Sequence, residues 1–149
     1  MRKENNTALI CGISGQDGAY LAAMLKAKGY NVWGTSRNPQ ESTLANISTL
    51  GIEKSVKVIP MSPMDVSSVV SALQESQPDE VYYLAGQSSV RLSFEQPNEA
   101  LESITVGILN LLESCRSLNR PIRVFHAGSG ECFGDTGDNA ANEETPFCP

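Results

Sequence analysis

The sequence predicts an α/β fold in which a doubly wound parallel sheet lies between two helical layers, a three-layer α/β/α arrangement. Two observations predict it. Five apolar runs typical of strands alternate with helical patterns, and three glycines separate the first strand from the first helix. Strands that alternate with helices form parallel βαβ units with right-handed crossovers. The 149 residues are enough for one domain with its own core.

The five predicted strands are short runs of apolar and β-branched residues. We expect them at Thr7–Cys11, Asn31–Ser36, Val56–Ile59, Val81–Leu84 and Arg123–Ala127. Residues 128–149 have the pattern of a loop.

The predicted helices follow from apolar residues at helical spacing, together with capping residues. They are a first helix that carries Leu21, Met24 and Leu25 and ends at Gly29, a weak helix around Leu44–Leu50, a third from the N-cap Asp65 to about Gln74, and a long one that follows Pro97 with a continuous apolar face from Leu101 to Cys115.

Composition limits the classes of partner. The net charge of −6 argues against nucleic acid and against an anionic membrane surface, and no apolar run is long enough to span a bilayer. The apolar run behind the basic first residues is too short for a signal peptide. The four cysteines lack metal-ligand spacing, so we expect no metal site and reduced thiols in a cytoplasmic protein.

The turn Gly12-x-x-Gly15-x-x-Gly18 lies between the first strand and the first helix. Such glycine spacing also occurs in ordinary loops. Between a strand and a helix, however, glycines let the backbone approach a pyrophosphate, which the helix N-terminus attracts. This arrangement is typical of a Rossmann-type domain and predicts dinucleotide binding.

The end of the second strand indicates which dinucleotide is bound. An acidic residue there would bind the ribose hydroxyls of NAD, but the chain has Ser36 and Arg37 and no acid from Asn31 to Gln40. Because a guanidinium pairs with a phosphate, NADP is favoured over NAD. The alternative is that Arg37 is simply a solvated loop residue.

Four segments carry a resemblance to a known family. They are Gly12-Ile-Ser-Gly-Gln-Asp-Gly18, Val81-Tyr-Tyr-Leu-Ala-Gly-Gln-Ser-Ser-Val90, Leu92-Ser-Phe-Glu-Gln-Pro97 and Ala127-Gly-Ser-Gly-Glu-Cys-Phe-Gly134. Over essentially its whole length the chain resembles the GDP-mannose 4,6-dehydratases, extended short-chain dehydrogenases/reductases that act on nucleotide sugars. The resemblance implies a Rossmann fold, bound NADP, and conversion of GDP-mannose to GDP-4-keto-6-deoxy-mannose.

The resemblance also implies roles for individual residues. For the cofactor they are Gly12, Ile13, Ser14, Gly15, Gln16, Asp17 and Gly18 at the pyrophosphate, Arg37 at the 2′-phosphate, Ser62 in place of an acid that contacts adenine, and Leu84, Ala85, Gly86, Gln87 and Ser88 at the nicotinamide-side ribose and the mouth of the sugar site. Ser129 matches the catalytic Ser/Thr that hydrogen-bonds the 4-hydroxyl of the sugar, and Glu131 matches the acid–base carboxylate.

The implied reaction explains why a carboxylate is needed. Oxidation at C4 of the sugar acidifies the proton on C5, a base removes that proton, water leaves from C6, and hydride returns to C6. Glu131 is the only carboxylate in the matching segment, and a general base must reach the proton that it removes. An epimerase needs no such base. Glucose-type dehydratases carry an Asp where this chain has Gly130.

Two departures from the family pattern leave alternatives open. No tyrosine is followed by a lysine four places on, although the family takes its catalytic tyrosine and lysine from a Tyr-x-x-x-Lys motif. Residues 1–149 therefore resemble the N-terminal, NADP-binding part of the enzyme without its substrate subdomain, and we expect the isolated chain to bind NADP weakly without turnover. The family's oligomerisation loop is poorly matched by Arg37–Thr43, so a homo-oligomer stays possible.

The alternatives to a dehydratase are a non-catalytic NADP-binding module and another nucleotide-sugar epimerase or reductase.

Overall fold

A computed structural model describes residues 6–39 and 44–149. Five strands form one parallel sheet in the order β3-β2-β1-β4-β5. The strands are β1 (Thr7–Cys11), β2 (Asn31–Ser36), β3 (Lys57–Pro60), β4 (Glu80–Tyr83) and β5 (Arg123–His126). The predicted doubly wound parallel sheet is confirmed. β2 and β3 are added on one side of β1, and β4 and β5 are added on the other.

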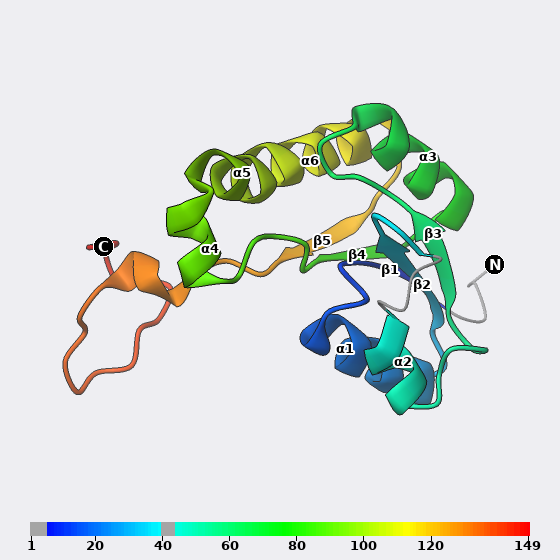
Figure 1. Ribbon diagram of the computed structural model, residues 1–149, viewed down its shortest axis with the longest axis horizontal. Coiled ribbons are helices and arrows are strands. Elements are labelled where there is room, and N and C mark those ends of the chain that lie inside the picture. Colours follow the sequence, from blue (N-terminus) through cyan, green and yellow to red (C-terminus); the bar gives the residue numbers. More distant parts are fainter. Residues whose placement is uncertain (1–5, 40–43) are drawn as a thin grey trace.

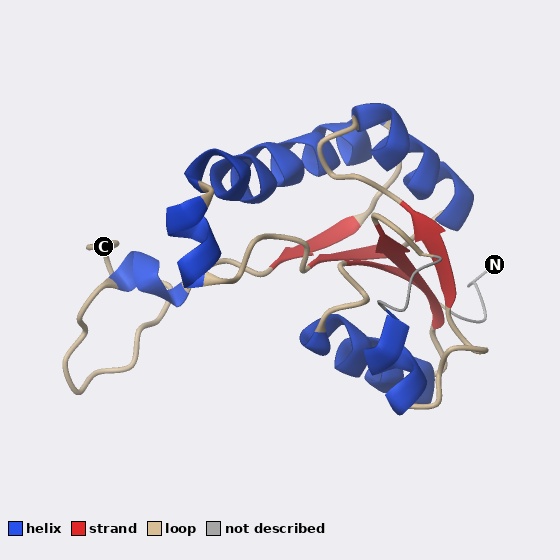
Figure 2. Ribbon diagram, viewed as in Figure 1, coloured by secondary structure: helices blue, strands red, loops and turns tan. Residues whose placement is uncertain are grey.

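Helices cover both faces of this sheet. They are α1 (Gln16–Ala27), α2 (Ala45–Thr49), α3 (Val66–Ser76), α4 (Val90–Glu95), α5 (Pro97–Leu101) and α6 (Gly107–Ser117), with a π-helical turn η2 (Glu102–Val106) and a 3₁₀ turn η3 (Gly130–Phe133). α1 and α2 lie on one face of the sheet, and α3, α5 and α6 lie on the other (Figures 1 and 2). No helix among the described residues is both long and apolar enough to cross a bilayer.

The core consists of two apolar clusters separated by β1. Leu9 and Cys11 belong to the cluster beneath α3 and α6, whereas Ala8 and Ile10 belong to the cluster above α1 and α2. Successive side chains of a strand point to opposite faces, so a strand buried on both faces is apolar without interruption. This explains why β1 could be predicted from its composition.

The predicted bounds of β1 and β2 match the structure, and so does the N-cap of α3. The carboxylate of Asp65 accepts hydrogen bonds from the Ser67 backbone N–H at 2.9 Å and the Ser67 hydroxyl at 2.7 Å. These bonds lower the pKa of Asp65 below its ordinary value. α3 then continues to Ser76, two residues beyond the predicted end.

Other predictions were wrong. The long helix begins at Pro97 as α5, but its apolar face is not continuous, because the π turn η2 changes the helical phase before α6. Leu101, Ile104 and Leu112, placed on the buried face by their spacing, are exposed.

Two short helical elements were not predicted. Residues 90–95 form α4, which Ser89 caps by accepting a hydrogen bond from the Leu92 N–H at 3.4 Å. Residues 130–133, predicted as loop, form η3, which begins after Ser129. Of the predicted oligomerisation loop at residues 37–43, residues 40–43 lie outside the described residues.

Candidate functional site

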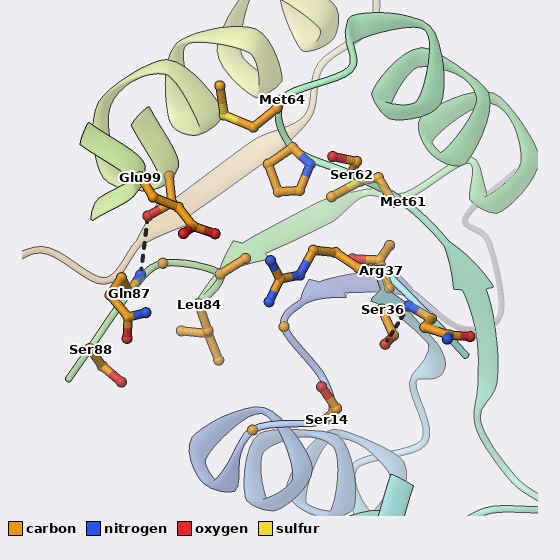
Figure 3. A pocket seen from close by; sticks show the side chains of 18 residues that line it. Ser14, Ser36, Arg37, Met61, Ser62, Met64, Leu84, Gln87, Ser88 and Glu99 are labelled. Carbon is orange, nitrogen blue, oxygen red and sulfur yellow. Dashed lines mark hydrogen bonds between the residues drawn. The ribbon is translucent and has the colours of Figure 1, made fainter. Parts of the chain in front are cut away.

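A cavity of about 570 Å³ opens at the carboxyl ends of the first four strands. This edge of a doubly wound sheet is where such folds bind ligands. Five segments far apart in the sequence line it, and Figure 3 shows side chains from these segments around one open volume. The lining residues are Gly12, Ser14, Gly15, Thr35, Ser36, Arg37, Asn38, Met61, Ser62, Pro63, Met64, Leu84, Ala85, Gly86, Gln87, Ser88, Glu99 and Ser103.

The glycine turn forms the floor of the cavity and leads into α1. Gly12 has a φ of +89°, and a Cβ on it would lie 2.9 Å from the carbonyl oxygen of Leu84. A Cβ on Gly18 would collide with the carbonyl of Gly12. The N–H of Gly15 donates to that same carbonyl at 3.1 Å. Only glycines fit this close packing, and α1 begins directly after the turn, with Gly15 as its N-cap.

Arg37 enters the cavity from the end of β2 (Figure 3). The hydroxyl oxygen of Ser36 accepts a hydrogen bond from the Asn38 N–H at 3.3 Å, which shapes the turn that carries Arg37. Arg37 is exposed, so its guanidinium is free of any burial cost. A ligand phosphate at this end of the cavity would meet a full positive charge.

Ser62 lines the cavity from the segment that follows β3. Its N–H donates to the Ser68 hydroxyl at 2.9 Å. The side-chain amide of Asn110 donates to the carbonyl of Pro63 at 2.9 Å and ties the segment to α6. Asp65 is directed to its own helix and does not line the cavity.

The turn after β4 forms the opposite wall, and the π turn η2 holds it in place. The Gln87 N–H donates to the Ser103 hydroxyl at 3.3 Å, and the Tyr83 hydroxyl donates to the Ser103 carbonyl at 3.2 Å. Burial raises the pKa of Tyr83 to about 12, so this hydroxyl keeps its proton as a donor. Ser103 thus connects β4, the turn and the helix.

Four residues predicted around the pyrophosphate do not line the cavity. Ile13 is fully buried and packs against Gly34, where a Cβ would collide with the Ile13 side chain. Gln16 and Asp17 are exposed in the first turn of α1, and Gly18 is buried behind the glycine turn. The side chains of Ile13, Gln16 and Asp17 lie outside this volume, although Gln16, Asp17 and Gly18 belong to the helix turn beside it.

The two predicted catalytic residues lie away from the cavity lining. Ser129 and Glu131 follow β5, both are exposed, and neither lines the cavity. The hydroxyl oxygen of Ser129 accepts a hydrogen bond from the Glu131 N–H at 3.2 Å, so in this structure Ser129 caps η3.

Eight lining residues were not predicted, and they fall into two groups. Most flank predicted positions at the carboxyl ends of β2 and β3, where the fold alone could have found them. Glu99 and Ser103 instead come from α5 and η2, and nothing in the helical spacing points them at a cavity. The eight are Thr35, Ser36, Asn38, Met61, Pro63, Met64, Glu99 and Ser103.

The fold and this site define a Rossmann-type domain with a ligand cavity at the carboxyl edge of its sheet. Comparison with known proteins identifies one family. The model of the family described as GDP-mannose 4,6 dehydratase matches residues 9–149. The chain therefore belongs to the GDP-mannose 4,6-dehydratase family, as the resemblance predicted.

Individual relatives agree with this assignment. The chain is 39% identical to GDP-mannose 4,6 dehydratase 1 of Arabidopsis thaliana over 99% of its length and 43% of the relative's. It is 34% identical to the human GDP-mannose 4,6 dehydratase over all of its length and 42% of that protein. The chain spans about two fifths of the length of these curated relatives.

A solved structure supports the fold. UDP-glucose 4-epimerase of Thermus thermophilus, in complex with NAD, superposes with a TM-score of 0.81 at 28% identity. The match covers 96% of this chain and 44% of that one.

Proposed function

We propose that this chain is the NADP-binding part of a GDP-mannose 4,6-dehydratase. The observation that carries the proposal is that the glycine turn and Arg37 line one cavity. The turn and the N-terminus of α1 would hold the pyrophosphate, and Arg37 would pair with the 2′-phosphate. Gly12 and Gly18, where a Cβ would meet backbone, fit a cradle built for close approach. The NAD complex of the Thermus epimerase supports a nicotinamide dinucleotide in a fold of this kind.

In the reaction proposed, NADP supplies the acceptor and donor of hydride when it is bound. Ser129 hydrogen-bonds the 4-hydroxyl of GDP-mannose, and Glu131 removes the proton on C5 and assists the loss of water from C6. Both roles rest on the resemblance. Their place just after β5 supports them, because the turn after the neighbouring strand β4 lines the cavity.

Arg37 provides the test of cofactor choice. Replacing a guanidinium that pairs with a phosphate removes a charge-assisted interaction worth about 1.5–3 kcal/mol, so Arg37→Ala should weaken NADPH binding by about tenfold or more. NADH lacks the 2′-phosphate, and its affinity should not change. Fluorescence titration of the chain with both nucleotides measures this.

The matched control is Arg91→Ala, which removes an exposed arginine of α4 that pairs with Glu95 at 3.5 Å, away from the cavity. It should leave both affinities unchanged. Equal losses of NADPH and NADH binding in Arg37→Ala would refute the 2′-phosphate role.

A second candidate is a non-catalytic NADP-binding module. It is favoured by the exposure of Ser129 and Glu131 outside the cavity lining. Incubation of the chain with GDP-mannose and NADP⁺, followed by chromatographic separation and mass spectrometry of the sugar nucleotides, tests turnover. We expect no product from the chain alone. A product that has lost water would contradict both this expectation and the non-catalytic module. A new product of unchanged mass would indicate an epimerase.

A further inference from the structure

The four cysteines occupy two different environments. Cys11 and Cys115 are buried in the core beneath α3 and α6, and burial raises the pKa of Cys11 to about 12 and that of Cys115 above its ordinary value. The thiolate is the reactive form of cysteine, so these two thiols are inert in the folded chain. Cys132 is half-buried in η3, and Cys148 is exposed.

Cys132 and Cys148 are held side by side by the backbone. The Cys148 N–H donates to the Cys132 carbonyl at 3.0 Å. The covalent bonds on either side of that hydrogen bond limit the Cα–Cα separation to less than about 7 Å. Disulfides join residues whose Cα atoms are about 4.4–6.8 Å apart, so the pair lies within or at the edge of bridging distance.

Two further contacts hold the same segments together. The rings of Phe133 and Phe147 meet edge to face, with centroids 5.3 Å apart. Gly134 lies so close to the Cys148 carbonyl that a Cβ on it would collide with that oxygen. The chain between the two cysteines runs outward as a loop and returns to η3, as the orange and red segment of Figure 1 shows.

We propose that Cys132 and Cys148 are a redox-active pair that a small disulfide, such as oxidised glutathione, converts into an intramolecular disulfide. The Cys148 thiolate attacks one sulfur of oxidised glutathione and releases a first glutathione thiolate. The Cys132 thiolate then attacks Sγ of Cys148 and releases a second. Two electrons pass from the cysteines to oxidised glutathione, and the two cysteine protons are balanced by the two glutathione thiols formed.

The disulfide closes residues 133–147 into a covalent loop directly after Glu131. It would therefore fix the turn that carries Ser129 and Glu131. The inference is independent of the proposed function, because it requires neither cofactor nor sugar nucleotide.

The test uses the 149-residue chain with graded ratios of oxidised to reduced glutathione. Free thiols are alkylated, and the digest is mapped by mass spectrometry. Effective concentrations of tethered groups reach the mM range, so at about 0.1 mM reduced glutathione the 132–148 link should exceed glutathione adducts at these positions by about tenfold. Cys11 and Cys115 should be alkylated only after denaturation.

Two glycine variants test whether the contact geometry matters. Gly134→Ala should lower the linked fraction several-fold, because its Cβ would displace the Cys148 carbonyl. Gly137→Ala is the matched control. Gly137 has a φ of +60°, close to the +65° of Gly134, but a Cβ there meets nothing within 4 Å. The linked fraction should not change in this control.

Three results would overturn the proposal. They are glutathione adducts on both cysteines without a link, links between chains only, and an equal loss of linkage in the two glycine variants.

Discussion

β1 and β5 belong to one parallel sheet but differ in packing. β1 has a strand on each side and is buried at all five residues. β5 pairs, within the described residues, with β4 alone, and three of its four residues are exposed. The glycine turn therefore extends from the most firmly packed strand, whereas Ser129 and Glu131 follow an edge strand. The proposed cofactor turn is thus anchored in the core, whereas the proposed catalytic residues follow a strand that is largely exposed.

Side-chain truncation in the two strands should give the largest contrast. Leu9→Ala removes a fully buried side chain of β1 and should destabilise the chain by about 2–5 kcal/mol. Phe125→Ala removes a larger side chain from β5, but 55% of Phe125 is exposed, so the cost should stay below about 1 kcal/mol. Urea denaturation followed by circular dichroism measures both. A similar cost for the two variants would remove the distinction between the strands.

Glycine substitution sharpens the comparison at the turns. Gly18→Ala forces a Cβ against the Gly12 carbonyl and should cost about 1–3 kcal/mol. Gly130→Ala, beside Glu131, meets nothing within 4 Å and should change stability by no more than about 0.5 kcal/mol. The same urea titration reports both values. If Gly130→Ala proved as costly as Gly18→Ala, the segment after β5 would be packed as tightly as the cofactor turn.

The smallest effect concerns pH and the cap of α3. The pKa of Asp65 is lowered in the folded chain, so its carboxylate adds stability above the unfolded value of 3.8, and this stability is lost as the pH falls through the folded pKa. Asp65→Asn keeps a capping side chain without the charge. The wild type should be the more stable protein at neutral pH, and the difference should shrink below pH 3.8. Thermal melts across this range measure it, and a constant difference would argue against the Asp65 carboxylate.

The parts of the fold that were predictable are those fixed by local signals. β1 is followed by a glycine turn and is buried on both faces. Asp65 is the N-cap of α3, and its side chain makes the capping hydrogen bond. The cavity residues at the glycine turn, at Arg37 and after β4 were predictable because parallel strands bring their carboxyl ends to one edge of the sheet.

The rest depended on tertiary structure. The π turn η2 leaves no trace in hydrophobic spacing, so the exposure of Leu101 and the role of Ser103 were missed. α4 is a short helix whose six residues include none that is buried, and its cap is a single serine. Cys132 and Cys148 lie close together because the chain between them turns back on itself. The number of residues between two cysteines does not predict such a reversal.

The π turn η2 has a consequence for how this chain tolerates changes of length. A π turn bonds residue i to i+5, one residue more than an α turn. Deleting one residue within Glu102–Val106 would let the segment close as ordinary α-helix, so that α6 keeps its packing on α3. The same deletion would withdraw Ser103 from Tyr83 and Gln87. The gain or loss of a single residue in η2 would therefore change the cavity wall and leave the packing of the core unchanged.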